Sequence, residues 1–322
     1  MYIIAYFIQM NFDLSTDNSI SNIETDPIKT DLIETDPIKA DPTEPSLIKL
    51  TENKIKVFCY NILADKYAYP SRYPHLDPVL LSWPYRLNLI LKKIKMSNAD
   101  IICLQETELK TVKKDIADNL PEYDYYCHTI TKKRTCAIGN ITLWNKKMCV
   151  KKTYFNSCGI FVDFLAHNSD LENTSEPCGK KFCIGNIHLR AGRVTKEAER
   201  ENQIKSCIKK ISTEYPAIIC GDFNDRMAPT GILMNTFNKN NFTSYSCGLS
   251  WLGMVEDSEK IIGEDLYSHI IPNSSYPYEI DTFDHIVSNK LKIDVVKNPT
   301  MVLIPSESEP SDHLAMEFYI GN

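Results

Sequence analysis

Glycine is scarce in this chain: only 11 of its 322 residues are glycine. Neither GxxxxGK[ST] nor GxGxxG occurs, which disfavours nucleotide binding of those two kinds. GxSxG is also missing, so the chain lacks the nucleophile turn of α/β-hydrolases. No apolar run reaches membrane-spanning length, and the apolar residues 1–10 lack the basic region and cleavage site of a signal peptide. The sequence therefore predicts a protein that does not bind to a membrane.

Paired cysteines are missing too. The 11 cysteines are odd in number and include no CxxC pair, and Cys59, Cys103 and Cys220 lie inside apolar segments. This pattern is typical of reduced core thiols, so we expect a reducing compartment and a cytoplasmic location. Zinc ligation by Cys178 and Cys183 is an alternative, but no second pair at metal-ligand spacing follows them.

Excess charge of one sign is confined to the first 50 residues. They carry nine acidic and three basic side chains, a balance of −6, which equals the formal net charge of the whole chain. Residues 51–322 carry 33 side chains of each sign. A neutral body argues against sequence-blind wrapping of long nucleic acid, although a local basic patch can still bind a few phosphates.

The same 50 residues contain a direct repeat. Residues 23–29 and 33–39 both read IETDPIK, and each copy holds a proline and acidic residues but no aromatic residue. Such a segment cannot bury enough apolar surface to fold. We predict a disordered acidic tail over residues 1–50 and a catalytic domain over residues 51–322. A docking segment for a protein partner is the alternative interpretation of the tail.

From residue 55 onward, short apolar segments alternate with helical patterns. Strands are predicted at 55–63, 99–106, 136–144, 160–165, 182–189, 217–220, 282–287 and 313–318. Apolar residues at helical spacing predict helices from Pro84 to about residue 94, over 109–120 and over 196–211. The alternation indicates an α/β protein. Short apolar strands and few glycines favour two packed sheets flanked by helices over one open parallel sheet.

One stretch, residues 217–225 (AIICGDFND), is central to the site prediction. Its apolar residues read as a buried strand that Gly221 ends. Asp222 and Asn224 are two residues apart, so their side chains leave the backbone on the same side and can converge. A carboxylate beside an amide at a sheet edge suits the orientation and deprotonation of water. The alternative is a loop in which both residues cap the following turn.

Other predicted strands also end near a polar residue that can take part in chemistry. The full set is Asn61, Glu106, His188, Asp222 with Asn224, Asp284, and Asp312 with His313. Strand ends are neighbours only when the strands share a sheet or lie in facing sheets. We therefore predict that these groups line one cleft. For His188 and His313, a packed core histidine is the alternative interpretation.

Six segments occur in the order found in enzymes of the endonuclease/exonuclease/phosphatase superfamily. They are Tyr60–Ala64, Trp83–Arg86, Asp100–Glu106, Asn186–Leu189, Gly221–Asn224 and Pro310–Leu314. The Trp83–Arg86 segment, with Tyr73-Pro74-His75 before it, resembles the branch that holds the cytoplasmic mRNA deadenylases, nocturnin and the Angel proteins. The resemblance covers roughly residues 55–320. It implies a DNase I-like, four-layer α/β sandwich, with two packed mixed β-sheets flanked by helices, that hydrolyses phosphate esters.

The resemblance also implies a metal site. Glu106 resembles the principal metal-binding carboxylate of the family, Asn61 lies beside that metal, and Asp312 is implied to bind a second one. Hard divalent cations prefer oxygen ligands, so this set suits Mg²⁺, with Mn²⁺ as an alternative, better than zinc.

The remaining polar residues resemble the groups that act on water and phosphate. Asp222 matches the residue that orients or deprotonates the attacking water, and Asn224 helps to hold it. His313 resembles the histidine that contacts the scissile phosphate, and Asp284 holds its ring and favours its charged form. His188 matches a second phosphate-contacting histidine. All five are predicted catalytic residues.

Arginine is rare, with seven among the 36 basic residues. Arg190 nevertheless follows His188 by two residues, and Arg226 follows Asn224 by two. Arginine binds phosphate with a planar fork of donors. We therefore predict that Arg190 and Arg226 bind substrate.

These features together predict a Mg²⁺-dependent phosphodiester hydrolase, foremost a deadenylase-like 3′-exoribonuclease acting on single-stranded RNA. Deadenylases of this branch commonly place a tryptophan and proline segment after the strand-end histidine. Here residues 190–193 (RAGR) stand in that place, closer to nocturnin, so poly(A) preference is open. A phosphatase acting on a nucleotide 2′-phosphate or an RNA-end cyclic phosphate, or a 2′,5′-phosphodiesterase, is an alternative. A non-catalytic RNA-binding adaptor is the alternative from another class, and the complete set of polar strand ends argues against it.

Overall fold

The computed structural model describes residues 54–129, 137–165, 181–192, 196–246, 248, 250–254, 278–296 and 304–321. For 252–254 and 278–280 it describes the backbone alone. The predicted acidic tail over residues 1–50 lies outside the described residues, and so does Cys178. No helix within the described ranges is both long enough and apolar enough to cross a membrane.

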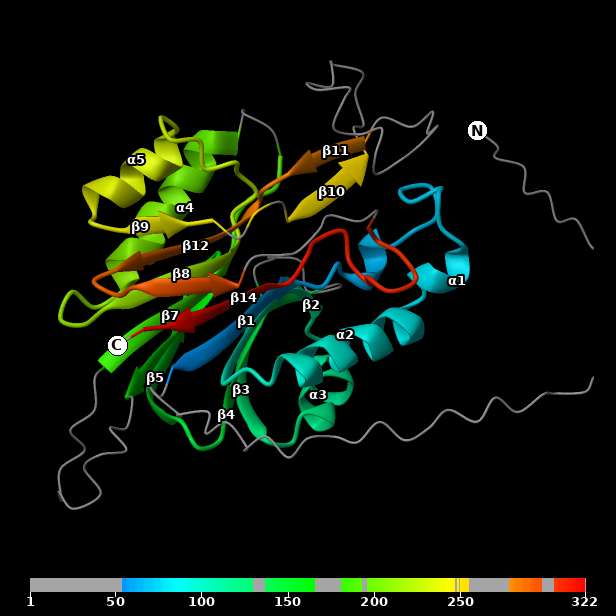
Figure 1. Cartoon of the computed structure of the whole chain (residues 1–322), viewed down its shortest axis with the longest axis horizontal. Helices are drawn as coiled ribbons and strands as arrows, with labels where there is room; N and C mark the ends of the chain where they lie inside the picture. The colour runs from blue at the N-terminus through cyan, green and yellow to red at the C-terminus, as the bar shows by residue number, and fades with distance from the viewer. Residues whose placement is uncertain are drawn as a thin grey trace, which may run out of the picture. The chain divides into compact units, whose positions relative to one another are not determined.

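Two six-stranded sheets form the core of the fold (Figure 1). The first contains β1 (Ile55–Asn61), β2 (Ile101–Glu108), β3 (Tyr123–Thr129), β4 (Ile138–Asn145), β13 (Ile293–Val296) and β14 (Met316–Ile320). The second contains β5 (Cys149–Phe155), β6 (Gly159–Leu165), β7 (Lys181–His188), β8 (Ala217–Asp222), β9 (Thr243–Tyr245) and β12 (Asp284–Asn289). A separate two-stranded sheet pairs β10 (Trp251–Met254) with β11 (Tyr278–Asp281).

Each large sheet is mixed and has one parallel pair near its middle. The strand orders are β13-β14-β1-β2-β4-β3 and β5-β6-β7-β8-β12-β9. The parallel pairs are β1 with β2 and β7 with β8, and the other neighbours run antiparallel. The prediction of two packed mixed sheets is confirmed.

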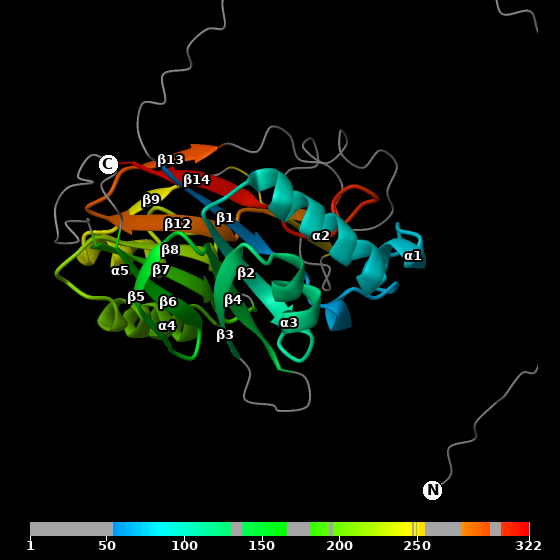
Figure 2. The same cartoon turned by 90° about the horizontal axis from the view of Figure 1, so that it is seen from below.

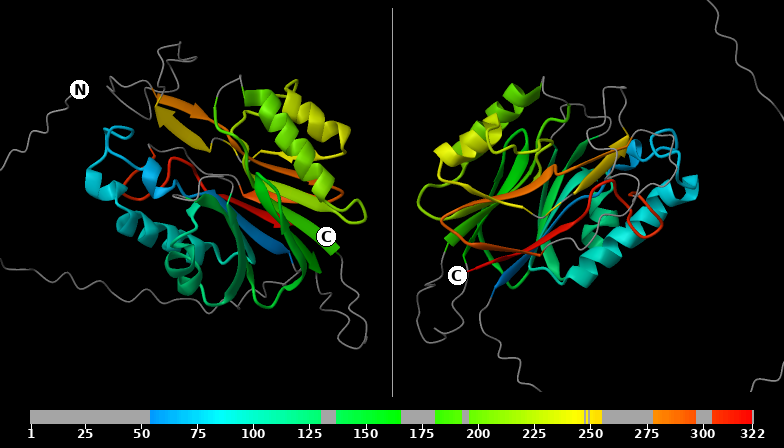
Figure 3. Two further views of the ribbon diagram at one scale, coloured as in Figure 1. Left: turned by 180° about the vertical axis from the view of Figure 1, so that it is seen from behind. Right: turned by 45° about the horizontal axis from the view of Figure 1, so that its top comes forward.

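Helices cover the outer face of each sheet (Figure 2). The helices are α1 (Pro78–Leu81), α2 (Trp83–Ser97), α3 (Val112–Asp115), α4 (Glu197–Lys210) and α5 (Ile232–Lys239). Ile90 and Ile94 of α2 pack against the outer side of the first sheet, and Ile204 of α4 packs against the second. Two helical layers and two sheets give the predicted four-layer α/β sandwich, which Figure 3 shows from two further directions.

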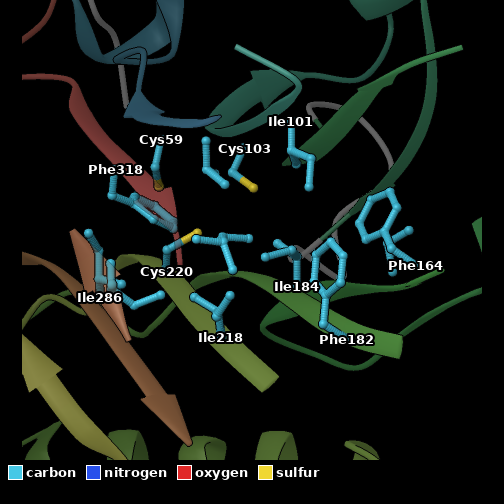
Figure 4. Packing of buried hydrophobic residues seen from close by; sticks show 14 of the residues in the cluster. Cys59, Ile101, Cys103, Phe164, Phe182, Ile184, Ile218, Cys220, Ile286 and Phe318 are labelled. Carbon is cyan, nitrogen blue, oxygen red and sulfur yellow. The ribbon is translucent and has the colours of Figure 1, made fainter. Parts of the chain in front are cut away.

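The layer between the sheets is the largest apolar cluster of the described residues. Figure 4 shows Cys59 and Cys103 of the first sheet facing Cys220 and Ile218 of the second. All four side chains are 1% exposed or less. The prediction that the strand cysteines are core residues is confirmed, and the eight cysteines within the described residues are free thiols.

Several predicted elements differ in extent from the structure, and two of these differences have a local explanation. The helix expected over 109–120 is a single α-helical turn, α3, followed by a 3₁₀ turn at Ala117–Asn119. The last strand begins at Met316 instead of His313, because the preceding loop is held by side chains. The Ser311 hydroxyl donates to the Asn61 carbonyl (2.7 Å) and accepts from the His313 N–H (3.2 Å).

A buried polar bridge joins the two sheets behind the ends of their parallel pairs. The Gln105 amide of β2 donates to Asn186 Oδ1 of β7 (2.8 Å), and Asn186 Nδ2 donates to the Ile141 carbonyl of β4 (2.9 Å). Both amide side chains are fully buried. Because unpaired polar groups are costly inside a protein, the bridge fixes how the sheets lie against each other.

Candidate active site

The polar residues predicted at strand ends gather at one edge of the sandwich. Asn61 ends β1, Glu106 lies near the end of β2, and His188 and Asp222 are opposite each other at the ends of β7 and β8. Asp284 begins β12 beside Asp222, and His313 lies in the loop before β14. Hydrogen bonds or ion-pair distances connect all six. Six of the eight predicted strand-end residues therefore converge, whereas the side chains of Asn224 and Asp312 have other partners.

Asn61 lies at the centre of this cluster. Its Nδ2 is 2.9 Å from Asp222 Oδ2, 3.3 Å from Glu106 Oε1 and 3.4 Å from His313 Nε2. Its Oδ1 accepts the Leu63 N–H at 3.1 Å. The fully buried amide thus donates to both carboxylates and sets their separation.

Asp222 lies between two imidazoles. Its Oδ2 is 3.5 Å from His188 Nε2 and 3.7 Å from His313 Nε2, while its Oδ1 accepts the backbone N–H of Asn224 (2.8 Å). The side chain is 2% exposed. Burial raises the pKa of Asp222 above its usual value, although both histidines oppose the shift. A carboxylate of raised pKa is a better general base.

His313 forms a tight pair with Asp284. The Nδ1 atom of His313 is 2.7 Å from Asp284 Oδ2. Burial disfavours the charged ring, but Asp284 and Asp222 outweigh burial and raise the pKa of His313 to about 10. The ring is therefore an imidazolium at neutral pH, with its Nε2 directed to the cluster. A cation at this position can stabilise charge on a phosphate oxygen.

Glu106 is held in an unusual backbone conformation. Its φ is +57°, in the left-handed region that non-glycine residues rarely adopt, and the register with β4 shifts between Leu104 and Thr107. Such bulges redirect a side chain. Glu106 Oε2 accepts the Ala64 N–H at 2.9 Å, so a loop after β1 fixes the carboxylate. A strained residue at a strand end is common at functional sites.

Three of these residues could hold a divalent ion. One ligand atom each from Glu106, His188 and Asp222 lie within 4.8 Å of one another. Two carboxylates in a partly buried site suit a hard cation. The donor set is therefore compatible with a magnesium or manganese ion.

Asp312 has different neighbours from the rest of the cluster. Its Oδ2 accepts the Tyr73 hydroxyl at 2.8 Å and Arg72 Nη2 at 3.2 Å. The side chain is 2% exposed. Within the described residues, its hydrogen bonds lead to Tyr73 and Arg72 and not to Glu106, His188 or Asp222. Second-metal binding by Asp312 stays a prediction.

The predicted substrate-binding arginines both lie on the surface near the strand ends. Arg190 is exposed just after β7, and its N–H donates to Gln203 Oε1 at 2.9 Å. Arg226 is exposed after β8 and its guanidinium forms an ion pair with Asp281. Asn224 has a φ of +50°, and its Nδ2 donates to the Leu189 carbonyl at 3.2 Å. The roles of these three residues stay predictions.

Arg86 is a residue that sequence reasoning used only as part of a resemblance. Its side chain is fully buried, and Nη1 donates to the carbonyls of Ile62 (3.1 Å), Leu63 (2.8 Å) and Pro310 (3.3 Å). These carbonyls belong to the loop that follows Asn61 and to the loop that carries His313. The sequence does contain a signal for a buried arginine, because Arg86 lies one turn before Ile90 on the apolar face of α2.

The fold is a DNase I-like α/β sandwich, and its candidate site gathers carboxylates and imidazoles at one edge of the two sheets. Residues 59–313 match the Endonuclease/Exonuclease/phosphatase family, and this match spans well over half of the chain. The chain therefore belongs to that family. The resemblance noted in the sequence is confirmed, and members of this family generally use a divalent metal.

Within this family, the chain is similar to several characterised proteins. Rat 2′,5′-phosphodiesterase 12 is 26% identical over 321 residues, which cover 83% of this chain and 52% of that protein. The CCR4-Not complex 3′-5′-exoribonuclease subunit Ccr4 of Phaeosphaeria nodorum is 38% identical over 74 residues, covering 23% and 12%. The chain thus spans about half or less of these relatives. The human Nocturnin catalytic domain shares the fold, with a TM-score of 0.55, 21% identity and coverage of 83% and 93%.

Proposed function

We propose that the protein is a Mg²⁺-dependent phosphodiesterase that removes nucleotides from the 3′ end of single-stranded RNA, as a deadenylase does. The observation that carries the proposal is the environment of Asp222, a buried carboxylate within 3.7 Å of two imidazoles and 2.9 Å of the Asn61 amide. The 74-residue similarity to an exoribonuclease subunit supports the choice of substrate.

In this proposal, Glu106 is the principal ligand of the metal, with Asp222 and His188 beside it. A bound Mg²⁺ would withdraw charge from the phosphate and stabilise the leaving oxygen. Mn²⁺ is an alternative ion. Residues of the chain position the catalytic carboxylates. The Asn61 amide holds Glu106 and Asp222 in place, and the Asn224 N–H orients Asp222.

Proton transfer and charge stabilisation follow from the two pKa shifts. Asp222, with a raised pKa, accepts a proton from the attacking water. His313, which is charged at neutral pH, donates from Nε2 to a non-bridging phosphate oxygen. Asp284 keeps the ring oriented through Nδ1. His188 contacts a second phosphate oxygen.

A second candidate function has its own support. The rat 2′,5′-phosphodiesterase 12 similarity covers 83% of this chain, far more than the Ccr4 similarity does. Hydrolysis of 2′,5′-linked oligoadenylate needs the same groups around the scissile phosphate. Phosphatase action on a nucleotide 2′-phosphate or an RNA-end cyclic phosphate remains a third product class to test.

The test is a comparison of substrates with one enzyme preparation. The full chain with Mg²⁺ is incubated with 3′,5′-oligoadenylate, 2′,5′-oligoadenylate, cyclic-phosphate-ended RNA and NADPH, and the products are identified by mass. We expect stepwise release of AMP from 3′,5′-oligoadenylate. Release of inorganic phosphate alone, or cleavage only of the 2′,5′ linkage, would assign one of the other functions.

Two matched variants test the site. Glu106→Gln and Asp222→Asn each remove one charge and should lower kcat by at least about 100-fold, the scale of losing a general base or a charge-stabilising group. The control is Asp294→Asn, since Asp294 is an exposed carboxylate of β13 that pairs with Lys54. Full activity in Glu106→Gln would refute the assignment of the metal ligand.

We also propose that the protein is located in the cytoplasm. Cytoplasmic placement is supported by buried free thiols such as Cys158 and Cys207, whose sulfur atoms are 3.1 Å apart.

We also propose that the acidic residues 1–50 bind a protein partner with a basic surface. Co-purification of full-length and Δ1–50 protein from cells would test this, and identical partners for both forms would contradict it.

A further inference from the structure

Arg72 lies beside the site and was not singled out by the sequence. It follows the 3₁₀ turn η1 (Asp65–Tyr67) in the loop that leads to α1. Its Nη2 is 3.2 Å from Asp312 Oδ2, and its guanidinium carbon is 5.5 Å from the centre of the Tyr73 ring. Asp312 directly precedes His313, so Arg72 is attached to the loop that carries this histidine.

The Arg72 guanidinium is held by one hydrogen bond to Asp312 and has further N–H donors without a protein acceptor among the described residues. Nη2 binds Asp312, whereas Nε and Nη1 make no hydrogen bond to any described residue. The Arg72 side chain is 32% exposed, while that of Asp312 is 3% exposed. Asp312 already accepts the Tyr73 hydroxyl at 2.8 Å, so it has a partner without Arg72. The structure therefore fixes the direction of Arg72 but leaves part of its fork accessible.

Arg72 is surrounded by groups that favour its positive charge, and Glu106 is one of them. Burial opposes the charge of Arg72, but Asp312, Tyr73 and Glu106 raise its pKa further above the ordinary value. The site holds four carboxylates, Glu106, Asp222, Asp284 and Asp312. An anionic substrate approaching them needs cations beyond the histidines.

We propose that Arg72 binds a second phosphate group of the substrate, the one next to the scissile phosphate along the chain. This rests on the proposed function, because it requires a substrate with more than one phosphate. The single bond from Nη2 to Asp312 uses one edge of the guanidinium, so the other edge still presents two parallel N–H donors, which match two oxygens of a phosphate. On this view Asp312 holds Arg72 in place.

The test compares two substrates that differ in this second phosphate. Bis(p-nitrophenyl) phosphate has a single phosphate, and 3′,5′-oligoadenylate has several. For Arg72→Gln we expect kcat/KM on oligoadenylate to fall about 10- to 100-fold, the scale of a lost charge-assisted hydrogen bond, mainly through KM. Activity on the single diester should stay within about two-fold, and Arg72→Lys should be intermediate.

The matched control is Lys54→Gln, which removes one positive charge at the opposite end of β1, where Lys54 pairs with Asp294. It should leave both activities unchanged. If Arg72→Gln lowers both activities equally, Arg72 acts only by supporting Asp312, and the proposal is overturned. Unchanged activity on both substrates overturns it as well.

A second measurement does not depend on turnover. The Nε–Hε resonance of Arg72, assigned by its absence from the spectrum of Arg72→Gln, is followed while the dinucleotide pApA, which carries two phosphates, is added to the metal-free protein. We expect a saturating shift, and an unmoved resonance would overturn the proposal. If the wild-type protein shows the shift but degrades none of the RNA substrates, the proposed function fails and the phosphate site stands.

Discussion

Arg86 offers the sharpest test of how the site is held together. Its guanidinium donates to the Leu81 carbonyl from Nε (3.1 Å) and from Nη1 to Ile62, Leu63 and Pro310. A lysine ammonium is compact and cannot reach both loops and the turn before α2 at once. Arg86→Lys therefore leaves two or more of the buried carbonyls without a donor.

The expected loss of stability follows from the number of carbonyls that lose their donor. Each carbonyl left unpaired in the interior costs about 1–3 kcal/mol, so we expect Arg86→Lys to lower the free energy of unfolding by about 3–5 kcal/mol. For a domain of this size, 1 kcal/mol corresponds to a change in Tm of about 2–4 °C, so Tm should fall by at least about 6 °C. Loosening both loops should also lower kcat at least about 10-fold, because small displacements of catalytic groups are costly.

The control separates lost stability from lost positioning. Ile94→Ala removes a fully buried side chain from the same helix and should cost about 2–5 kcal/mol. We expect a similar fall in Tm but unchanged kcat, measured well below both Tm values with bis(p-nitrophenyl) phosphate. The reasoning is refuted if Arg86→Lys keeps full kcat, or if Ile94→Ala loses as much kcat as Arg86→Lys does.

Three further predictions concern charge, backbone and metal. Asp284→Asn removes one of the carboxylates that together raise the pKa of His313 to about 10, so the pKa falls and the alkaline limb of kcat/KM should move to lower pH; an unmoved limb contradicts this. Gly221→Ala should destabilise the fold by about 2–4 kcal/mol in urea titrations, since φ is +139° and a Cβ would lie 1.9 Å from the Ile187 carbonyl oxygen. Chelation by EDTA should abolish activity, and Mg²⁺ or Mn²⁺ should restore it in the wild type but not in Glu106→Gln; metal-independent activity would be the contrary result.

The inner strands were predictable from sequence because they are buried on both faces. β2 and β8 begin with apolar residues whose exposed fraction is zero, and such runs stand out without an alignment. The edge strands β3 and β5 carry polar and charged residues such as Asp124, Lys151 and Lys152, which removes the apolar signal. α5 was missed although Leu233 and Phe237 have helical spacing, because this helix is only eight residues long.

The site was predictable to the extent that its residues end apolar strands. Asp222 and His188 are examples: each terminates a buried run, and the parallel pairing of β7 with β8 then puts them side by side. Arg72 and Arg86 show the limit. One lies in a loop and the other in a helix, and their importance comes from contacts with residues more than 200 positions away, Asp312 and Pro310.

The separation of the catalytic carboxylates depends on contacts between the sheets, since Glu106 belongs to one sheet and Asp222 to the other. The Asn61 amide connects Glu106 to Asp222, but one side chain alone does not fix their separation, because it can tilt. The Gln105–Asn186 bridge lies one residue before Glu106 and two residues before His188, and it resists sliding of one sheet over the other. Apolar packing alone tolerates such sliding, because it lacks direction. A polar bridge in the core therefore gives the site the positional accuracy that its chemistry needs.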